Sequence, residues 1–417
     1  MTQLADDCFA FGGPLLSVDA ALEILEERTA PIVGLETVAL AEAAGRILGE
    51  DLIAPRDVPL QDNAAVDGYA FQAAALSAAP DAPLRIAGRA AAGHPWPGRL
   101  GPGECLRIFT GAAMPEGVDT VVMQEDVRVE NEAVRIPAGL KPGANRRKAG
   151  EDIRAGSRAL EAGILLSAPH VAQAASFGLA RLTVRAPLRI ALLSSGDEVR
   201  EPGEEAVPGT VYDANRYLLA GLLRHLPVTV DDLGILPDDP EILIRHLERA
   251  ATENDLVVSS GGMSTGEEDH MKAAVERLGR LHFWRLAIKP GRPLALGQIG
   301  STPFLGLPGN PVAAAVCFLR IARPLILRLA GARALPPLCL RVAADFRHDK
   351  KAGRREWLRA ALVRDAAGHS RVRRFERQGS GVISSLVESD GLVELAEEVE
   401  TVAPGDLVDF LPYAGLT

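Results

Sequence analysis

The chain has 417 residues, more than one ordinary hydrophobic core organises, which predicts two to four domains. Hydrophobic residues make up 47% and charged residues 24%, a profile typical of a globular enzyme and not of a disordered chain. The formal net charge of -10 argues against general nucleic-acid binding, which needs a basic face. The four cysteines lie far apart and form no C-x-x-C pair, so they indicate neither a zinc site nor a disulfide framework.

The first residues show no basic segment followed by an apolar one, so they do not resemble an export signal. The longest apolar tract, residues 311–330, is interrupted by Arg320, Arg323 and Pro324. It therefore predicts a buried helix and not a membrane span. We expect a cytoplasmic protein.

Residues 15–53 have a helical pattern, first in SVDAALEILEERTA, with Ser17 as a candidate N-cap, and then in VALAEAAGRILGEDL. Residues 54–150 are rich in proline, glycine and short β-type runs such as LRIAG, CLRIFTG, TVVMQEDVRVE and AVRIP. Helical character returns over residues 151–186, most clearly in APHVAQAASFGLA. We predict a helical linker domain from residues 15–53 and 151–186, with a β-rich domain, residues 54–150, inserted into it.

Residues 187–333 alternate between strands and helices. The predicted strands are LRIALLSS, VTVDDLGIL, DLVVSSGG, the paired runs RLAIKP and PLALGQI, and FLGLPG, and the helices begin near Asn215, Pro240, Asp269 and Pro311. This alternation predicts a three-layer α/β domain with a mostly parallel sheet. The last segment, residues 334–417, has short strands and turns and predicts a small β-barrel.

Polar residues and glycines follow each predicted strand of the α/β domain. In an open parallel sheet, ligands bind beyond the carboxyl ends of the strands, so these residues are expected to converge. Glycine turns can hold a phosphate with backbone N–H groups, and clustered carboxylates hold a hard divalent cation. The sequence has neither the P-loop pattern G-x-x-x-x-G-K-[ST] nor G-x-G-x-x-G after a strand, which disfavours kinase-like enzymes and dinucleotide dehydrogenases. It indicates metal-assisted chemistry at a phosphate bond, with Lys289 or Arg292 screening charge.

The β-rich segment contains a second group of polar turns: DNAAVDGYA, RIFTG and the Gly150–Asp152 turn. Each of these alone is more typical of a solvated turn than of a binding site.

Taken together, DNAAVDGYA, RIFTGAAMPEG, VVMQE, SSGDE, VYDANR, SSGGMSTGEEDH, LAIKPGRP and GLPGNP resemble the molybdopterin molybdenumtransferase family, the MoeA-type enzymes similar to the E-domain of gephyrin. The resemblance runs in order over nearly the whole chain. It implies an enzyme that inserts molybdate into adenylylated molybdopterin and releases AMP with the help of Mg²⁺. It also implies a homodimer whose cleft joins the α/β domain of one subunit to the β-rich domain of the other. Contacts with molybdopterin adenylyltransferase and with molybdoenzyme chaperones are further implied partners.

The resemblance also implies site residues. The catalytic set is Asp67, Thr110, Asp152, Glu198, Asp238, Asp269 and Lys289. The set that binds the pterin substrate is Ser195, Gly196, Asp197, Ser259, Gly261, Gly262, Ser264, Arg285, Arg292, Pro308, Gly309, Asn310 and Pro311. The metal ligands are Glu198, Asp238 and Asp269, of which Asp269 with Glu198 or Asp238 is expected to position Mg²⁺ or molybdate.

Two departures from the family pattern stand out: Arg285 replaces a common lysine, and His270 replaces an aromatic residue. Arginine binds anions in a planar, bidentate manner, so the first change is not neutral at an anion site. Two alternative functions remain open from sequence. One is the preceding step, adenylylation of molybdopterin by ATP; the other is a non-catalytic carrier or scaffold for the cofactor.

Overall fold

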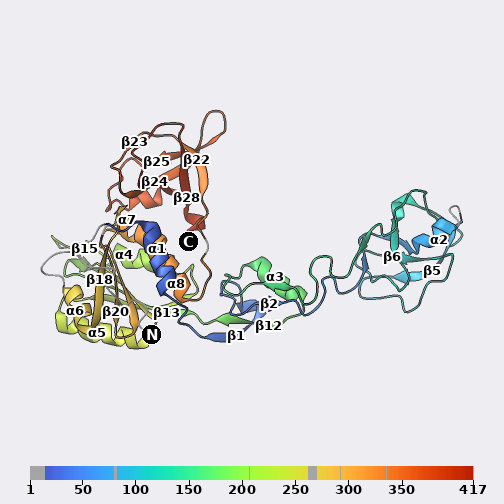
Figure 1. The fold of residues 1–417 in the computed structure, drawn as a ribbon, viewed down its shortest axis with the longest axis horizontal. Helices are drawn as coiled ribbons and strands as arrows, with labels where there is room; N and C mark the ends of the chain where they lie inside the picture. The colour runs from blue at the N-terminus through green and yellow to red at the C-terminus, as the bar shows by residue number, and fades with distance from the viewer. Residues whose placement is uncertain are drawn as a thin grey trace.

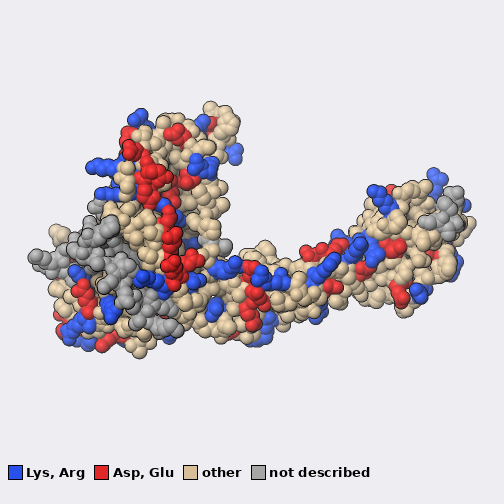
Figure 2. Space-filling view, viewed as in Figure 1, with Lys and Arg blue, Asp and Glu red and all other residues tan. Residues whose placement is uncertain are grey.

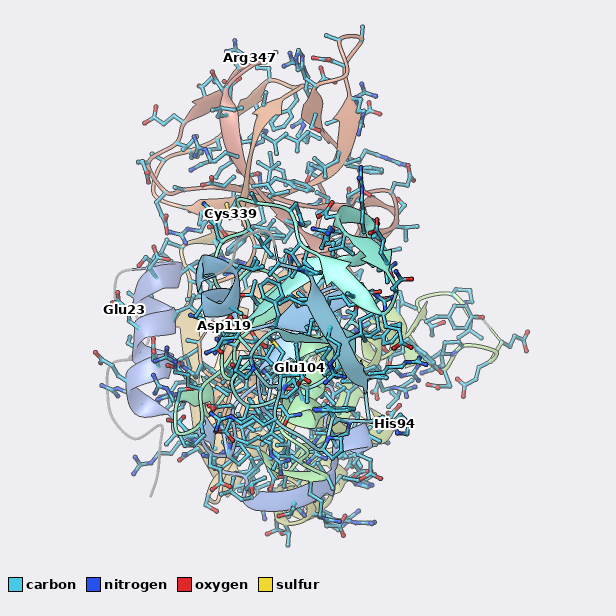
Figure 3. The ribbon with its side chains drawn as sticks, turned by 90° about the vertical axis from the view of Figure 1, so that its right-hand side faces the viewer. Glu23, His94, Glu104, Asp119, Cys339 and Arg347 are labelled. Atoms are coloured by element: carbon cyan, nitrogen blue, oxygen red, sulfur yellow. The ribbon has the colours of Figure 1, made fainter. Side chains whose placement is uncertain are left out.

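A computed structural model describes residues 15–78, 82–205, 207–261, 270–291, 293–334 and 336–416 of the chain. A bulky body at one end is joined by a thin arm to a separate lobe at the other (Figure 1). Figure 3 looks from the lobe end, so Glu104 and Asp119 of the lobe lie in front of the body and Arg347 lies above them. The chain is therefore elongated, and residues in the body and the lobe are far apart.

The body is built on a six-stranded sheet. In spatial order its strands are β16 (Val228–Leu236), β13 (Leu188–Ser195), β17 (Leu256–Ser260), β21 (Thr302–Leu307), β20 (Pro293–Ile299) and β18 (Gly279–Arg285). The first four strands are parallel, and β20 and β18 form an antiparallel pair at the edge. The predicted mostly parallel sheet is confirmed, and β13 and β16 coincide with the predicted runs.

One predicted pairing in this sheet is wrong. The run RLAIKP was expected to pair with β20, but the partner of β20 is the preceding segment, β18. Only Arg285 of the predicted run belongs to β18, and Ile288–Lys289 forms a separate short strand, β19. The sequence GRLHFWR of β18 contains aromatic and long side chains that suit a strand. The prediction placed the strand at RLAIKP and overlooked this segment.

Helices cover both faces of the sheet. One face carries α1 (Val18–Arg28), α4 (Ala214–Leu223), α7 (Pro311–Cys317) and α8 (Arg323–Leu329), the last two joined by a π-helical turn, Phe318–Ala322. The other face carries α5 (Pro240–Glu253) and α6 (His270–Leu278). Successive strand residues face opposite sides, so Leu192 packs in the first core and Leu193 in the second. This is the predicted three-layer arrangement. Within the described residues, no helix is both long enough and apolar enough to cross a bilayer.

The helices begin at residues that can cap them. Ser17 caps α1 as predicted, its side chain accepting from Ala20 N–H at 3.2 Å. Asp213 caps α4 and Asp239 caps α5, and Pro240 at the first position of α5 has no N–H that would need a partner. These caps place the first turns of α4 and α5 just beyond the carboxyl ends of the strands.

The C-terminal part of the body is a closed five-stranded β-barrel, as predicted. Its strands pair in a ring in the order β24 (Arg355–Arg364), β25 (Ser370–Arg374), β22 (Leu340–Ala344), β28 (Leu407–Pro412) and β26 (Gly391–Leu395), which returns to β24. Leu358, Val372, Val393 and Phe410 fill its interior. A short pair, β23 (His348–Asp349) with β27 (Thr401–Val402), and a helical turn, α9 (Ser384–Val387), complete it.

Several contacts attach the barrel to the rest of the body, and two of them involve the start of β24. The strand β19 pairs in parallel with β24. Arg355, on β24 and 9% exposed, donates to both carboxylate oxygens of Asp19 on α1 at 2.8 and 2.7 Å and to Glu397 at 3.0 Å. The hydrogen bond from Arg355 lowers the pKa of Asp19. Figure 2 shows acidic side chains gathered over α1 and the adjacent part of the barrel. Burial alone would lower the pKa of Arg355, but Asp19, Glu394 and Glu397 outweigh burial and raise it.

The arm consists of two short strand pairs and one helix. β1 (Leu35–Ala39) pairs with β12 (Arg181–Arg185), β2 (Leu52–Ile53) pairs with β11 (Arg158–Leu160), and α3 is Ala168–Ser176. The helix predicted for VALAEAAGRILGEDL is wrong, because this stretch contributes to β1 and then forms one 3-10 turn, Leu40–Glu42. Gly45 has a φ of +80°, which ends any helix there. The pairing of Val38 with Leu182 is a long-range contact that a local pattern cannot reveal.

The lobe is a second β-rich unit. Most of its strands lie in the runs predicted to be strands, but Gly68–Phe71 is a strand within DNAAVDGYA, which was predicted to be a turn. Its sheet has the order β7 (Thr120–Met123), β4 (Gly68–Phe71), β6 (Glu104–Ile108), β5 (Leu84–Ala90), β9 (Ala133–Arg135) and β8 (Arg128–Glu130). A short pair, β3 (Asn63–Ala64) with β10 (Arg146–Arg147), and a helix, α2 (Ala73–Ala78), complete it.

In the body, β14 (Val199–Arg200) and β15 (Val211–Tyr212) pair in parallel in the loop after β13.

Candidate active site

Three loops meet at the carboxyl end of the parallel strands. Gly261, directly after β17, donates its N–H to the Leu307 carbonyl of β21 at 3.3 Å. A Cβ at Gly261 would lie 3.0 Å from the carbonyl oxygen of Ser195, and its φ of +84° lies in the left-handed region. A Cβ at Gly309 would lie 3.7 Å from the Cα of Gly261. The loops after β13, β17 and β21 therefore pack backbone to backbone, which is the close approach that an anion-binding turn requires.

Glu198 folds back over Gly196. A Cβ at Gly196, whose φ is +138°, would lie 2.6 Å from Oε2 of Glu198, so only glycine leaves room for this carboxylate. The neighbouring loop touches the same turn, because the N–H of Asp238 donates to Oδ1 of Asp197 at 3.3 Å. The loops that carry Glu198 and Asp238, two of the three predicted metal ligands, are thus in direct contact.

The two loops carry carboxylate side chains, and carboxylate oxygens are the ligands that Mg²⁺ prefers. The type of side chain in these loops therefore suits a hard divalent cation. The third predicted ligand, Asp269, lies outside the described residues. Among the residues that are described, no group of three or more His, Cys, Asp or Glu side chains could hold a metal ion together. The structure therefore brings together the loops of two predicted ligands, and the metal site itself stays a prediction.

Buried serines line the ends of β13 and β17. Ser194, Ser195, Ser259 and Ser260 are each at most 3% exposed, and Ser194 is in register with Ser260. The hydroxyl oxygens of Ser194 and Ser195 have no hydrogen-bond partner within the described part of the chain. Buried polar atoms almost always have one, so these hydroxyls suit a polar ligand at this edge. Of the four, the sequence predicted Ser195 and Ser259.

The predicted loop Pro308–Pro311 is held from two sides. From α4, the Nδ2 of Asn215 donates to the carbonyl oxygen of Gly309 and to Oγ of Ser260, both at 2.8 Å. From the barrel, the carbonyl of Ser380 accepts from the N–H of Val312 at 3.0 Å. Sequence analysis did not single out Asn215 or Ser260 as site residues. The signal for Asn215 was its place in VYDANR, at the start of a helix beside the strand ends.

Lys289, predicted as a charge partner at this edge, has a partner in the barrel. Its Nζ lies 2.8 Å from Oε1 of Glu356 on β24, and Nε2 of His348 lies 3.4 Å from the other oxygen. Burial alone would raise the pKa of Glu356, but hydrogen bonds from His348 and Lys289 outweigh burial and hold that pKa below its usual range. Lys289 therefore links the sheet to the barrel, and its catalytic role stays a prediction.

In the lobe, the predicted residues Asp67 and Thr110 are in direct contact. Oδ1 of Asp67 accepts from the backbone N–H of Thr110 at 2.8 Å and from its hydroxyl at 2.7 Å. These two hydrogen bonds lower the pKa of Asp67, and Arg107 adds to the effect. Asp152 is exposed, and its N–H donates to the carbonyl of Val58 at 3.1 Å. The lobe thus presents the ionised, half-buried carboxylate of Asp67 in a fixed orientation.

Within one chain, these two groups of residues do not form one site, because the lobe and the body stand at opposite ends of the molecule (Figure 1). The structure brings together the loops after β13, β16, β17 and β21, and separately Asp67 with Thr110. Gly262, Ser264, Asp269 and Arg292, and the side chain of Arg285, lie outside what the structure describes.

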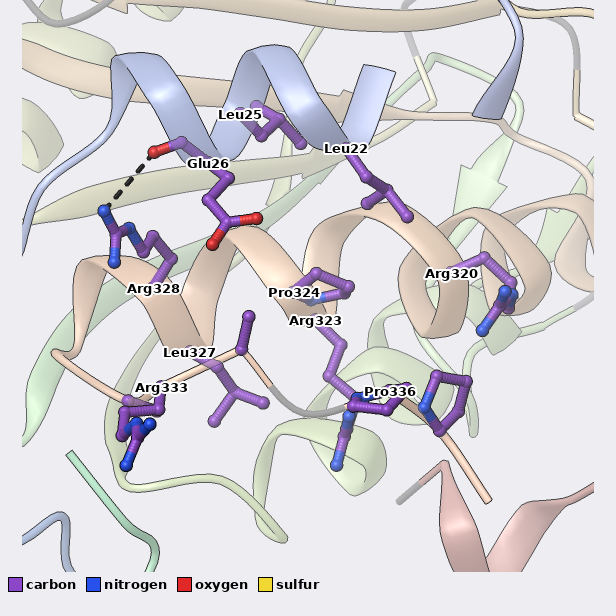
Figure 4. Close-up of a pocket in the computed structure, with 13 residues that line it drawn as sticks. Leu22, Leu25, Glu26, Arg320, Arg323, Pro324, Leu327, Arg328, Arg333 and Pro336 are labelled. Atoms are coloured by element: carbon purple, nitrogen blue, oxygen red, sulfur yellow. Dashed lines mark hydrogen bonds between the residues drawn. The ribbon is translucent and has the colours of Figure 1, made fainter. Parts of the chain in front are cut away.

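A pocket of about 250 Å³ lies elsewhere in the body, between α1, α8 and the segment after α8 (Figure 4). Leu22, Leu25 and Leu327 form apolar walls, and Arg328 donates to the backbone carbonyl of Glu26 at 3.3 Å. None of the predicted site residues lines this pocket. The strand ends therefore remain the candidate site.

Family models match three consecutive parts of the chain. Residues 16–178 match the MoeA N-terminal region, comprising its domains I and II. Residues 191–328 match a probable molybdopterin-binding domain, and residues 341–413 match the MoeA C-terminal region, domain IV. The second match contains the strand ends described above, and the first contains the lobe.

Relatives match the chain over nearly its full length. A molybdopterin molybdenumtransferase of Haemophilus influenzae is 36% identical, over 96% of this chain and 99% of that protein. Molybdopterin molybdenumtransferase 2 of Mycobacterium tuberculosis is 34% identical, over 88% of this chain and 93% of that protein. A solved structure of the molybdopterin biosynthesis MoeA protein of Pyrococcus horikoshii is 31% identical, with a TM-score of 0.78 over 96% of this chain and 99% of that one. The arrangement of body, arm and lobe and the matched residues lead to one conclusion: this chain belongs to the MoeA family of molybdopterin molybdenumtransferases.

Proposed function

We propose that this protein inserts molybdate into adenylylated molybdopterin and releases AMP, giving the molybdenum cofactor. The observation that carries the proposal is the carboxyl edge of the parallel sheet. Three glycine loops pack against one another there, and the loops of Glu198 and Asp238 touch beside them. Relatives named molybdopterin molybdenumtransferase match at up to 36% identity over most of the chain, and they favour this function over the adenylyltransferase and over a carrier.

The roles of the residues follow from the geometry. The loops of Gly196, Gly261 and Gly309 expose backbone to the ligand and are proposed to bind its phosphate groups. Glu198 and Asp238, with Asp269, are proposed to hold Mg²⁺. When bound, the ion would neutralise charge on the phosphates and on the departing AMP. In the lobe, Asp67 is ionised and is oriented by Thr110, which suits it to hold or orient a polar group of the substrate.

We further propose that the working enzyme is a homodimer in which the lobe of one chain completes the site of its partner. The support is the distance between the two groups of predicted residues within one chain (Figure 1). Closed two-fold dimers are the commonest homo-oligomers, and in the proposed dimer each lobe would lie against the body of the other chain.

Mixing two variants tests this shared site. Asp67→Asn alters the lobe and Asp238→Asn alters the body, so a dimer with one copy of each retains one intact site. If subunits exchange freely, mixing equal amounts should restore about a quarter of wild-type activity. A mixture with no more activity than its parts, despite subunit exchange seen by native mass spectrometry, would place each complete site within a single chain.

The direct test of function follows AMP release from adenylylated molybdopterin with molybdate and Mg²⁺, together with reconstitution of a molybdoenzyme apoprotein. Molybdate-dependent AMP release with active cofactor is expected. ATP consumption with free molybdopterin would instead establish the adenylyltransferase.

The remaining predictions from sequence are carried forward as proposals. The protein is proposed to act in the cytoplasm and to contact molybdopterin adenylyltransferase and molybdoenzyme chaperones. Its proposed domains are residues 15–53 with 151–186, 54–150, 187–333 and 334–417. The first proposed domain, residues 15–53 with 151–186, includes α1. Val18, Ala21 and Leu25 of this helix pack in the core of the body.

A further inference from the structure

The first turn of α4 connects loops that come from different strands. Asn215, 9% exposed, lies beside the carboxyl ends of β17 and β21. Its Nδ2 donates to Oγ of Ser260 and to the carbonyl oxygen of Gly309, each at 2.8 Å. One buried amide thus spans two of the three loops proposed to bind phosphate.

The orientation of this amide follows from its partners. A carbonyl oxygen can only accept, so the atom that faces Gly309 must be the nitrogen of Asn215. That nitrogen has two hydrogens, and each has one partner here. Because Oγ of Ser260 accepts one of them, the hydroxyl hydrogen of Ser260 must point away from Asn215. Ser260 is then a donor suited to an acceptor such as a phosphate oxygen.

The helix that carries Asn215 is itself firmly fixed. The next residue, Arg216, is 5% exposed, and its guanidinium donates to Asp213 at 3.1 Å, to Asp232 of β16 at 2.6 Å and to Glu201 in the loop after β13. Desolvation would lower the pKa of Arg216, but these three carboxylates outweigh it and raise that pKa. The support under Asn215 is therefore rigid.

We propose that Asn215 is a positioning residue for a phosphate group of the substrate. It fixes the separation of the Ser260–Gly261 and Gly309 loops, and it orients the hydroxyl of Ser260 to donate to a phosphate oxygen. This inference rests on the proposed function, of which it names one further part.

The chain offers a matched control in Asn254. This side chain is also buried, at 7% exposed, and its Nδ2 also makes two hydrogen bonds, to the Ala250 carbonyl at 3.2 Å and to Asp231 at 3.3 Å. It lies at the amino end of β17, on the opposite edge of the same sheet. Asn254→Ala should therefore lower stability much as Asn215→Ala does, without touching the site.

The experiment compares Asn215→Ala, Ser260→Ala, the double variant and Asn254→Ala. For each, KM and kcat for adenylylated molybdopterin, the Kd for AMP by calorimetry and the melting temperature are measured. Each site variant should raise KM and the Kd for AMP about tenfold, the cost of one buried hydrogen bond. If Asn215 acts through Ser260, the double variant should fall well short of the about hundredfold loss that independent effects would give.

Three results would overturn the inference: a KM and a Kd for AMP within twofold of wild type in Asn215→Ala, multiplicative losses in the double variant, or an equal loss in Asn254→Ala. Failure of the proposed function gives a different result. In that case wild type releases no AMP from the substrate, while the AMP affinities still decide whether Asn215 positions a phosphate.

Discussion

Replacing Lys289 by methionine removes an ion pair between the sheet and the barrel. We expect this to lower the free energy of unfolding by about 1–2 kcal/mol. A hydrogen bond to a charged group contributes about 1.5–3 kcal/mol. Nζ of Lys289 lies 2.8 Å from Glu356, whose side chain is 5% exposed, but the lysine side chain is 56% exposed. Water screens a half-exposed amine, so the expected value lies around and below the lower end of that range. Methionine keeps the length of the side chain and removes the charge.

The stabilisation that Lys289 provides should depend on pH and should be lost at low pH. In the folded protein the pKa of Glu356 is held below its usual range, chiefly because the hydrogen bonds from His348 and Lys289 outweigh burial. The ionised carboxylate therefore stabilises the fold above its unfolded pKa of about 4.3. That stability is lost as pH falls through the folded pKa. The difference between wild type and Lys289→Met should be full at pH 7 and should shrink below about pH 4.

Trp357 provides the assay, because it neighbours Glu356 on β24 and is 1% exposed. With the other two tryptophans, Trp96 and Trp284, changed to phenylalanine, fluorescence during urea unfolding reports on Trp357, which packs in the core where the barrel meets the sheet. Lys351→Met, on an exposed lysine nearby, is the control and should leave the midpoint unchanged. An unchanged midpoint in Lys289→Met would show that the contact between Lys289 and Glu356 does not stabilise the barrel.

Two further substitutions test the site itself. Thr110→Val removes one of the two hydrogen bonds that lower the pKa of Asp67, so the acid limb of the pH–rate profile for AMP release should move to higher pH. Thr401→Val, which removes a similar hydroxyl from an aspartate of the barrel, should not move it, and an unmoved limb in Thr110→Val would contradict the role of Asp67. Gly196→Ala would place a Cβ 2.6 Å from Oε2 of Glu198 and displace that carboxylate. The half-saturating Mg²⁺ concentration should rise severalfold, and an unchanged Mg²⁺ titration would remove Glu198 from the proposed metal site.

Much of the fold could be predicted because its strands are read from local patterns. The runs 188–195 and 228–236 coincide with β13 and β16, and the barrel and the lobe lie where short β-type runs cluster. The wrong predictions concern segments whose secondary structure depends on pairing with residues far away in the sequence. The alanine-rich segment after Val38 has a helical pattern. However, Val38 pairs with β12 in a strand, and the positive φ of Gly45 prevents a helix from continuing there.

The site was predictable where residues follow strands, and less so where side chains cross between elements. Gly261 and Gly309 could be placed because parallel strands end at one edge. The bond from Asn215 to the Gly309 loop joins residues 94 positions apart, and no local pattern marks it. Lys289 shows the converse: its motif suggested a role at the edge, whereas its ion pair with Glu356 depends on how the barrel docks.

The most direct test of the proposed function measures AMP release by the purified wild-type protein from adenylylated molybdopterin with Mg²⁺, in the presence and absence of molybdate. We expect release that depends on molybdate and yields cofactor able to activate a molybdoenzyme apoprotein. Tight binding of the substrate by a folded sample, with no AMP released and no cofactor formed, would contradict it and identify a carrier instead.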